Sequence, residues 1–199
     1  MRYLNKIVFI NSAAIRYSEV QLDGNIHLIG TQGVGKSTIL RAILFFYNAD
    51  TQRLGIPVEK KSYQDYYFPY ADSSIIYEVA REDGWFTVLS YKTMNRICYR
   101  FIASPYRPDL FIDEEGAPYP SDRIRSVLDK NGIKYSGAIS TYEEYRNILY
   151  GNSDNKRDYS CYSLMESGSY QNIIRTIQNV LLNSRLEADY IKQTIITSL

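Results

Sequence analysis

The feature that most constrains this chain is the stretch from Gly30 to Thr38, which reads Gly-Thr-Gln-Gly-Val-Gly-Lys-Ser-Thr. It fills every fixed position of the phosphate-binding loop pattern G-x-x-x-x-G-K-[ST]. Glycines let the backbone wrap closely around an anion, so that several N–H groups can point at phosphate oxygens. A helix that opens directly after the loop adds the positive end of its dipole. The motif therefore predicts a site for a nucleoside triphosphate.

Two positions of the loop carry specific roles. Lys36 is expected to reach the β and γ phosphates as a point charge, which makes it the candidate catalytic residue, and Ser37 is expected to offer its hydroxyl to Mg²⁺. The predicted nucleotide-binding residues are Gly30, Thr31, Gln32, Gly33, Val34, Gly35, Lys36, Ser37 and Thr38.

The flanking residues agree with this motif, because a phosphate-binding loop follows a strand and opens a helix. Residues 25–29 (Asn-Ile-His-Leu-Ile) predict a short buried strand. Residues 37–47 are apolar on nearly every face, as expected for a helix buried beneath a sheet. The alternative, a chance glycine-rich turn before a helix, is disfavoured by this context.

Two further strands are expected ahead of the loop. Residues 3–10 contain a near-continuous apolar run, and residues 17–22 alternate as a half-exposed strand does. Asp23-Gly24 then predicts a hairpin turn. The chain should therefore begin with three strands, the loop and a helix.

Downstream of that helix the pattern changes to β structure. Residues 73–81, 85–92 and 96–103 are β-rich and are separated by links short enough for hairpins, so they predict an antiparallel meander. A further short strand is a candidate at residues 110–113. The connection at residues 48–69 is expected to hold one short helix at most, with its aromatic residues packing onto the domain rather than contacting a ligand.

The order of these elements, with the run IHLIGTQGVGKSTILRAILFF, resembles the N-terminal half of an ABC-type ATPase head. The most similar branch contains the structural maintenance of chromosomes (SMC), RecF-like and MukB-like proteins. Gln32 stands where that branch usually has asparagine, and it keeps an amide side chain. The resemblance implies an α/β P-loop NTPase fold, the N-terminal lobe of an ABC-type head with an antiparallel β subdomain and C-terminal helices.

The resemblance also implies ligands and partners. ATP with Mg²⁺ would bind the loop, the C-terminal half of the same head and a second head would complete the site, and DNA is a candidate partner. The function implied is ATP-driven head engagement in DNA processing, maintenance or defence. The competing hypotheses are a stand-alone P-loop nucleotide-binding protein of another class, such as a small kinase, and an interaction module that binds nucleotide structurally and never hydrolyses it.

Elements that such a head needs for hydrolysis are missing from the sequence. No Walker B strand or signature loop is found, and no glutamine falls near residues 139–142, where the family senses Mg²⁺; Gln171 and Gln178 lie in a helical pattern. Asp113-Glu114 superficially resembles a Walker B ending, but a hairpin turn is favoured. The isolated chain is therefore expected to bind ATP without efficient turnover.

Contacts to adenine are less constrained than contacts to phosphate. In related heads the turn after the first strand lies beside the base and ribose. By that resemblance the candidates here are Asn11, Ser12, Arg16 and Tyr17. The alternative is that they are ordinary turn residues and strand aromatics.

The last third of the chain is expected to be helical. Helices are predicted at residues 121–130 and from a capping box at Thr141 to about Tyr150, followed by a polar loop. Residues 170–199 predict either two core helices or the base of a coiled coil. The chain thus divides into residues 1–113, with the loop, its helix and the β lobe, and residues 114–199, the helical part.

Composition excludes some classes of protein. Hydrophobic content of 45% and charged content of 23% are ordinary for a soluble globular protein, and the 199 residues suffice for one sizeable core. No run is long enough to span a bilayer and no signal peptide is evident, so a cytoplasmic protein without membrane contact is expected. Cys98 and Cys161 lack metal-site spacing and are expected to be reduced thiols.

Charge and aromatic content give no direct sign of nucleic-acid binding. The net charge of +1 creates no global field that would attract DNA, but it does not exclude a local basic patch on the surface. The 20 tyrosines are scattered through predicted strands and loops, so most are expected to serve β structure and core packing rather than base stacking.

Overall fold

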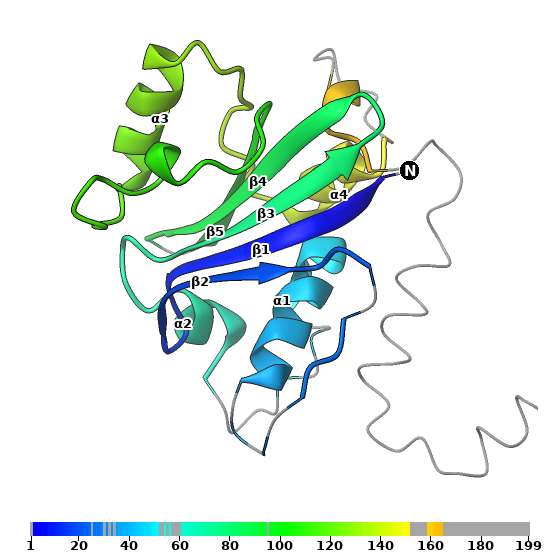
Figure 1. Ribbon diagram of the computed structural model, residues 1–199, viewed down its shortest axis with the longest axis vertical. Coiled ribbons are helices and arrows are strands. Elements are labelled where there is room, and N and C mark those ends of the chain that lie inside the picture. Colours follow the sequence, from blue (N-terminus) through cyan, green and yellow to red (C-terminus); the bar gives the residue numbers. More distant parts are fainter. Residues whose placement is uncertain are drawn as a thin grey trace, which may run out of the picture.

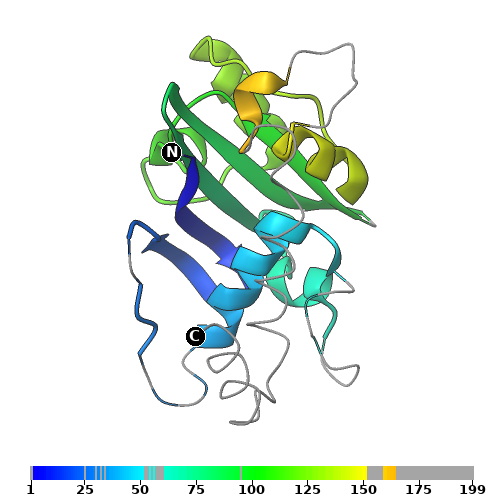
Figure 2. The ribbon, with the colours of Figure 1, turned by 90° about the vertical axis from the view of Figure 1, so that its right-hand side faces the viewer.

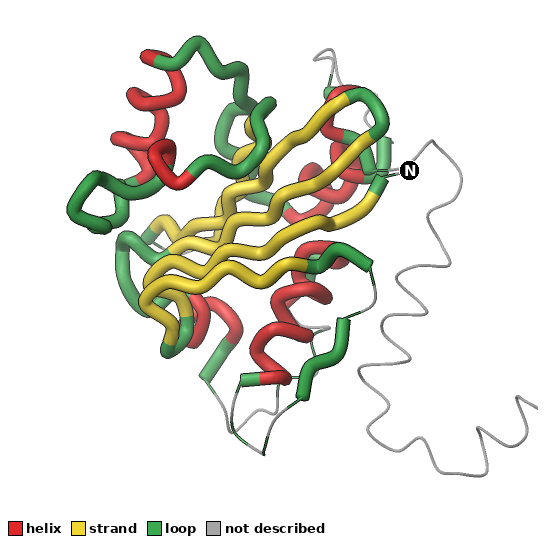
Figure 3. Tube along the Cα trace, in the orientation of Figure 1, coloured by secondary structure: helices red, strands yellow, loops and turns green. Residues whose placement is uncertain are grey.

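The computed structural model describes residues 2–24, 26–29, 31, 33, 35–51, 54, 56, 61–94, 96–151 and 159–164. Its centre is a five-stranded sheet in the order β2-β1-β3-β4-β5, in which every neighbouring pair is antiparallel (Figures 1 and 3). The strands are β1 (Tyr3–Ser12), β2 (Ile15–Gln21), β3 (Ser74–Arg81), β4 (Gly84–Thr93) and β5 (Arg96–Ile102).

Both faces of this sheet are covered, which explains the near-continuous apolar runs of its central strands. In β1, Ile7 and Phe9 belong to one hydrophobic cluster, and Val8 and Ile10 belong to another on the opposite face. Every residue of β3 from Ser74 to Ala80 is buried. The sheet therefore separates the molecule into two apolar layers.

Helices lie on each side of the sheet. On one side are α1 (Lys36–Asn48), α2 (Tyr63–Tyr67), α4 (Tyr142–Leu149) and the short 3-10 helix η3 (Ser160–Tyr162). On the other side are α3 (Ser121–Lys130) and the 3-10 helix η2 (Pro108–Leu110). Figure 2 shows α1 and α4 together on the side of the sheet that faces the viewer.

Most of the predicted elements are confirmed. The two leading strands, the three-stranded meander and the helices α1, α3 and α4 lie within a few residues of their expected bounds. The predicted cap of α4 is also present, since the Thr141 hydroxyl accepts a hydrogen bond from the Glu144 N–H at 3.3 Å. The single short helix expected in the connection is α2, which Ser62 caps through the Asp65 N–H.

The predicted strand at residues 25–29 is wrong. Residues 26–29 belong to no strand, and Ile26 and Ile29 are 40% and 89% exposed. A short apolar segment becomes a buried strand only where another strand offers it backbone partners, and none of the described strands pairs with it. The candidate strand at residues 110–113 is also wrong, because η2 ends there and only an isolated bridge, Ile112 to Pro118, follows.

Other expectations fall outside the described residues. These are the helical pattern at residues 170–199 with Gln171 and Gln178, and most of the polar loop after Gly151. Cys98 is buried in β5 and Cys161 is exposed in η3, and neither of these two described cysteines forms a disulfide.

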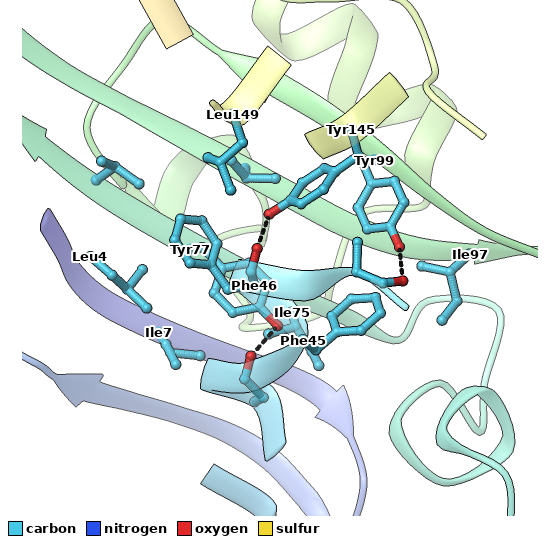
Figure 4. Packing of buried hydrophobic residues seen from close by; sticks show 14 of the residues in the cluster. Leu4, Ile7, Phe45, Phe46, Ile75, Tyr77, Ile97, Tyr99, Tyr145 and Leu149 are labelled. Carbon is cyan, nitrogen blue, oxygen red and sulfur yellow. Dashed lines mark hydrogen bonds between the residues drawn. The ribbon is translucent and has the colours of Figure 1, made fainter. Parts of the chain in front are cut away.

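Buried tyrosines fasten α1 to the rest of the fold (Figure 4). Their hydroxyls donate to main-chain carbonyls of this helix and its C-cap at five points. The donor and acceptor pairs are Tyr67 to Thr38 (2.8 Å), Tyr77 to Ala42 (3.1 Å), Tyr145 to Phe46 (2.6 Å), Tyr150 to Tyr47 (2.6 Å) and Tyr99 to Ala49 (3.4 Å). The helix that opens at Lys36 is thereby held along its whole length.

Candidate functional site

The two described glycines of the loop that follow Thr31 have a left-handed backbone conformation. Gly33 and Gly35 have φ angles of 91° and 93°, in the left-handed region that other residues avoid. A Cβ atom added at either position would meet nothing within 4 Å, so conformation rather than space requires glycine there. Gly30, Gln32 and Val34 lie outside the described residues.

Gly35 is the N-cap of α1, and no side chain caps this end of the helix. The N–H groups of Thr38 and Ile39 both donate to the Gly35 carbonyl, at 3.0 and 3.2 Å. The first turn contains no acidic residue. The positive end of the helix dipole is therefore not compensated by a carboxylate within its own first turn.

Lys36 lies across the loop. Its ammonium donates to the carbonyl oxygen of Thr31 at 2.8 Å, which links the start of α1 to the start of the loop. The charge of Lys36 is thus held beside the main chain at Thr31.

A cleft of about 900 Å³ opens at this end of α1. It brings together Gly33, Gly35, Lys36, Ser37 and Thr38 from the loop and helix with residues from other parts of the chain. Its described lining residues are Gly33, Gly35, Lys36, Ser37, Thr38, Arg41, Ile56, Lys61, Tyr66 and Tyr67. Three of these are cations and none is a carboxylate, so the described lining favours an anionic ligand.

Two aromatic side chains of α2, Tyr66 and Tyr67, also line the cleft. Tyr67 stacks on Tyr63 with ring centroids 4.1 Å apart, and Tyr63 stacks on Phe45 of α1 at 4.4 Å. Tyr66 packs edge to face against Tyr67 at 5.0 Å, and its hydroxyl lies 3.4 Å from the Thr38 hydroxyl. An aromatic stack therefore runs from the core to the cleft.

Burial raises the pKa of the Tyr67 hydroxyl above its usual value, and the positive charge of Arg41 opposes this shift. Tyr67 is consequently neutral at physiological pH and acts as a donor, which is its role toward the Thr38 carbonyl.

Sequence reasoning missed the lining residues outside the loop. Arg41 carries a detectable signal, because it follows Ser37 by four residues and so shares its helix face. Lys61 and Tyr66 have no such signal, since they lie far along the chain from the loop and only the tertiary structure brings them to the cleft. Tyr63 and Tyr67 are buried packing residues, as the sequence predicts, although Tyr67 also lines the cleft; Tyr66 is a more exposed part of that lining.

None of the four adenine candidates lines the cleft. The Asn11 amide donates to Asp72 at 2.9 Å, and the Ser12 hydroxyl donates to the Tyr67 carbonyl at 2.8 Å. The Tyr17 hydroxyl meets that of Tyr106, which belongs to the apolar layer on the α3 side. Arg16 is exposed in β2. In this structure Asn11 therefore contacts the turn before β3, and Ser12 contacts the end of α2.

Asp113 is a turn residue. Its carboxylate accepts hydrogen bonds from the N–H groups of Glu115 and Ala117, at 3.1 and 2.7 Å. The neighbouring Leu110 and Phe111 pack in the layer on the α3 side, opposite α1. The hairpin interpretation of Asp113-Glu114 is confirmed.

Ser37, the residue that the motif predicts as a Mg²⁺ ligand, lines this cleft. Among the described residues no cluster of three or more acidic, histidine or cysteine side chains could hold a metal by itself. Mg²⁺ often keeps several waters and binds through few protein ligands together with substrate phosphates, so a hydroxyl beside a triphosphate suits it. Ser37 would hold the ion, with nucleotide oxygens supplying further ligands.

Comparison with known families places the chain in a described family. A family described as "Protein of unknown function (DUF3584)" matches residues 11–199, which is most of the chain, and the chain therefore belongs to this family. A comparison with curated proteins finds no match. Within the part of the chain that the structure describes, no helix is both long and apolar enough to cross a bilayer.

Proposed function

We propose that this member of the DUF3584 family is the ATP-binding N-terminal part of an SMC-like ATPase head. Such a head would act in DNA processing, maintenance or defence, with ATP driving its engagement with a second head. The observation that carries the proposal is the cleft at the start of α1, where Gly33, Gly35 and residues 36–38 of the loop and helix meet Arg41 and Lys61. A loop of this pattern in a cationic cleft suits a triphosphate.

Each described residue has a distinct part in binding. The left-handed Gly33 and Gly35 turn the loop backbone, and the uncapped start of α1 directs its dipole at the bound anion. The Lys36 ammonium, already directed at the Thr31 carbonyl inside the loop, meets the β and γ phosphates. Mg²⁺ held by Ser37 would bridge phosphate oxygens and neutralise part of their charge.

The chain is proposed to bind ATP without efficient turnover. Phosphoryl transfer needs a residue that positions the attacking water, and no acidic residue is among the described lining of the cleft. Ile26 and Ile29, just before the loop, are exposed, and among the described strands none pairs with this apolar segment. Both features favour completion of the site by a C-terminal half of the head and by a second head.

The strand pairing favours this proposal over a small kinase. Kinases of the P-loop class build parallel βαβ units after the loop. Here α1 is followed by β3, β4 and β5, which pair antiparallel with one another, and β3 pairs antiparallel with β1.

The test is calorimetric titration of the chain with Mg-ATP, together with an assay of phosphate release. We expect measurable binding, a loss of affinity of at least about tenfold in Lys36→Ala because a charge-assisted contact is removed, and negligible turnover. Lys130→Ala is the matched control, because Lys130 ends α3 on the opposite side of the sheet. Equal affinities of wild type and Lys36→Ala would overturn the role of the loop, and rapid turnover by the monomer would overturn the incomplete-head proposal.

The proposed DNA role needs its own measurement. Phosphate contacts release counterions, so affinity for duplex DNA should fall steeply as salt is raised. Binding that requires ATP and the completed head, with such a salt dependence, is the expected result.

A further inference from the structure

We propose that Tyr66 is the nucleobase-stacking residue of this cleft, the ring on which the base of a bound nucleoside triphosphate lies. The inference rests on the proposed function and deepens it, because the phosphate-loop motif assigns no residue to the base. None of the adenine candidates expected from the resemblance lines the cleft, so the base contact has to come from elsewhere.

The cleft has two kinds of lining. The loop and α1 contribute glycines, hydroxyls and the cations Lys36 and Arg41, which suit phosphates. The connection and α2 contribute Ile56, Tyr66 and Tyr67, which suit an apolar planar group. The volume of about 900 Å³ is near the upper end of the range for small-molecule pockets, so a triphosphate alone would leave much of it empty.

Of the two tyrosines that line the cleft, Tyr66 is the one whose ring is accessible to a nucleobase. Tyr67 is only 1% exposed, its ring is stacked on Tyr63, and its hydroxyl is bonded to the Thr38 carbonyl. Tyr66 is 39% exposed and is supported by the edge-to-face contact with Tyr67. A ring that is already supported loses little conformational entropy when a base stacks on it.

The position of Tyr66 relative to the loop suits this role. Its hydroxyl lies 3.4 Å from that of Thr38, the residue that follows the Mg²⁺-binding Ser37. The ring therefore stands beside the first turn of α1, where a base joined through ribose to loop-held phosphates can reach it. Tyr17, the exposed aromatic residue among the adenine candidates, instead meets Tyr106 on the α3 side of the sheet.

The test compares two ligands that differ in the base, Mg-ATP and inorganic tripolyphosphate with Mg²⁺. Base–aromatic stacking is lost on alanine substitution, so Tyr66→Ala should weaken Mg-ATP binding by about tenfold or more. The affinity for tripolyphosphate should change by less than about twofold, because phosphates do not stack. Tyr66→Phe keeps the ring and should bind Mg-ATP nearly as wild type does.

Tyr70→Ala is the matched control, since Tyr70 is 62% exposed just beyond α2 and does not line the cleft. It should leave both affinities unchanged. Circular dichroism and thermal unfolding of each variant show whether the fold is kept. If Tyr66→Ala unfolds, Tyr66→Phe is the variant to measure. A normal Mg-ATP affinity of Tyr66→Phe supports a role of the ring rather than of the hydroxyl.

The outcomes separate the two proposals. If Tyr66→Ala leaves Mg-ATP affinity unchanged, or weakens both ligands equally, the stacking proposal is overturned. If Lys36→Ala still weakens tripolyphosphate binding in that case, the proposed phosphate site is supported and only the proposed base site fails. If wild type binds neither ligand, the proposed function itself fails, and the stacking proposal fails with it.

Discussion

The hydroxyl of Tyr145 in α4 donates a 2.6 Å hydrogen bond to the carbonyl oxygen of Phe46 in α1, 99 residues earlier in the chain. Phe46 lies in the last turn of its helix, where carbonyls have no partner within the helix. Tyr150 and Tyr99 supply the same bond to Tyr47 and Ala49. Tyrosine hydroxyls thus satisfy the C-terminal carbonyls of the helix whose other end forms the cleft.

Removing the Tyr145 hydroxyl should destabilise the fold. In Tyr145→Phe the ring still fills its place, but the buried Phe46 carbonyl loses its donor, which should cost about 1–2 kcal/mol of unfolding free energy. Urea denaturation followed by circular dichroism measures the loss. Tyr70→Phe, the same change at an exposed position, should cost nearly nothing. Equal stability of the two variants would contradict the role given to this bond.

Removing a tyrosine hydroxyl should affect Mg-ATP binding at one end of α1 and not at the other. Tyr67→Phe removes the bond to Thr38 beside the loop, whereas Tyr150→Phe removes the bond to Tyr47 at the far end. Both variants should lose about 1 kcal/mol of stability. Only Tyr67→Phe should also weaken Mg-ATP binding, by a few-fold, because the first turn of α1 is less well held. Calorimetric titration of both variants is the measurement, and an equal effect on affinity would refute the distinction.

Gly35→Ala should weaken Mg-ATP binding by about 5- to 30-fold, because alanine disfavours the backbone conformation of this position. The φ angle of 93° is costly for alanine by about 1–2 kcal/mol, although nothing lies within 4 Å of the added Cβ. The strain should shift the loop away from its binding conformation. Gly116→Ala is the matched control, with a φ of 79° and equally open space in the turn after Asp113. It should cost similar stability and leave Mg-ATP affinity intact; loss of affinity there would count against a local effect.

Stability should fall in alkaline solution because of the buried tyrosines. Burial raises the pKa of Tyr63, Tyr77 and Tyr145 well above the usual tyrosine value of 10.0. The folded protein therefore holds these protons more tightly than the unfolded chain. This contribution is fully present below about pH 10 and is lost as the pH rises toward the folded-state pKa values, at about 1.4 kcal/mol per pH unit for each tyrosine.

Tyrosinate absorbance at several urea concentrations measures this effect without interference from lysine. We expect part of the tyrosine signal to appear only together with unfolding above pH 10. A smooth titration of all tyrosines before unfolding would contradict the burial-based shift.

The phosphate loop, its helix and the meander are readable from the sequence because their signals are local. Gly33, Gly35 and Lys36 stand at fixed spacing, the helix after them is apolar on nearly every face, and short links such as Asp83-Gly84 allow only hairpins between β3 and β4. The Thr141 cap is equally local. These elements depend on neighbours within a few residues.

The strand expected at residues 25–29 shows the limit of such signals. Its apolar pattern is present, but a strand needs hydrogen-bonding partners from distant residues, and among the described strands none lies beside it. The hydrogen bonds of the Tyr67, Tyr77 and Tyr145 hydroxyls could not be predicted from the sequence for the same reason. Each hydroxyl donates to a carbonyl that is distant in the chain and that only the packing of the fold brings near.

Local spacing thus determined that the chain has a phosphate-loop motif opening a helix, followed by a β meander. The tertiary structure decided which residues join that loop in the cleft. Lys61 and Tyr66 line the cleft together with the first turn of α1, although they lie more than 20 residues further along the chain. Asn11 and Ser12 instead donate hydrogen bonds to Asp72, in the turn before β3, and to the Tyr67 carbonyl at the end of α2. The physical reason is that a cleft is built from long-range packing, which one stretch of sequence does not encode.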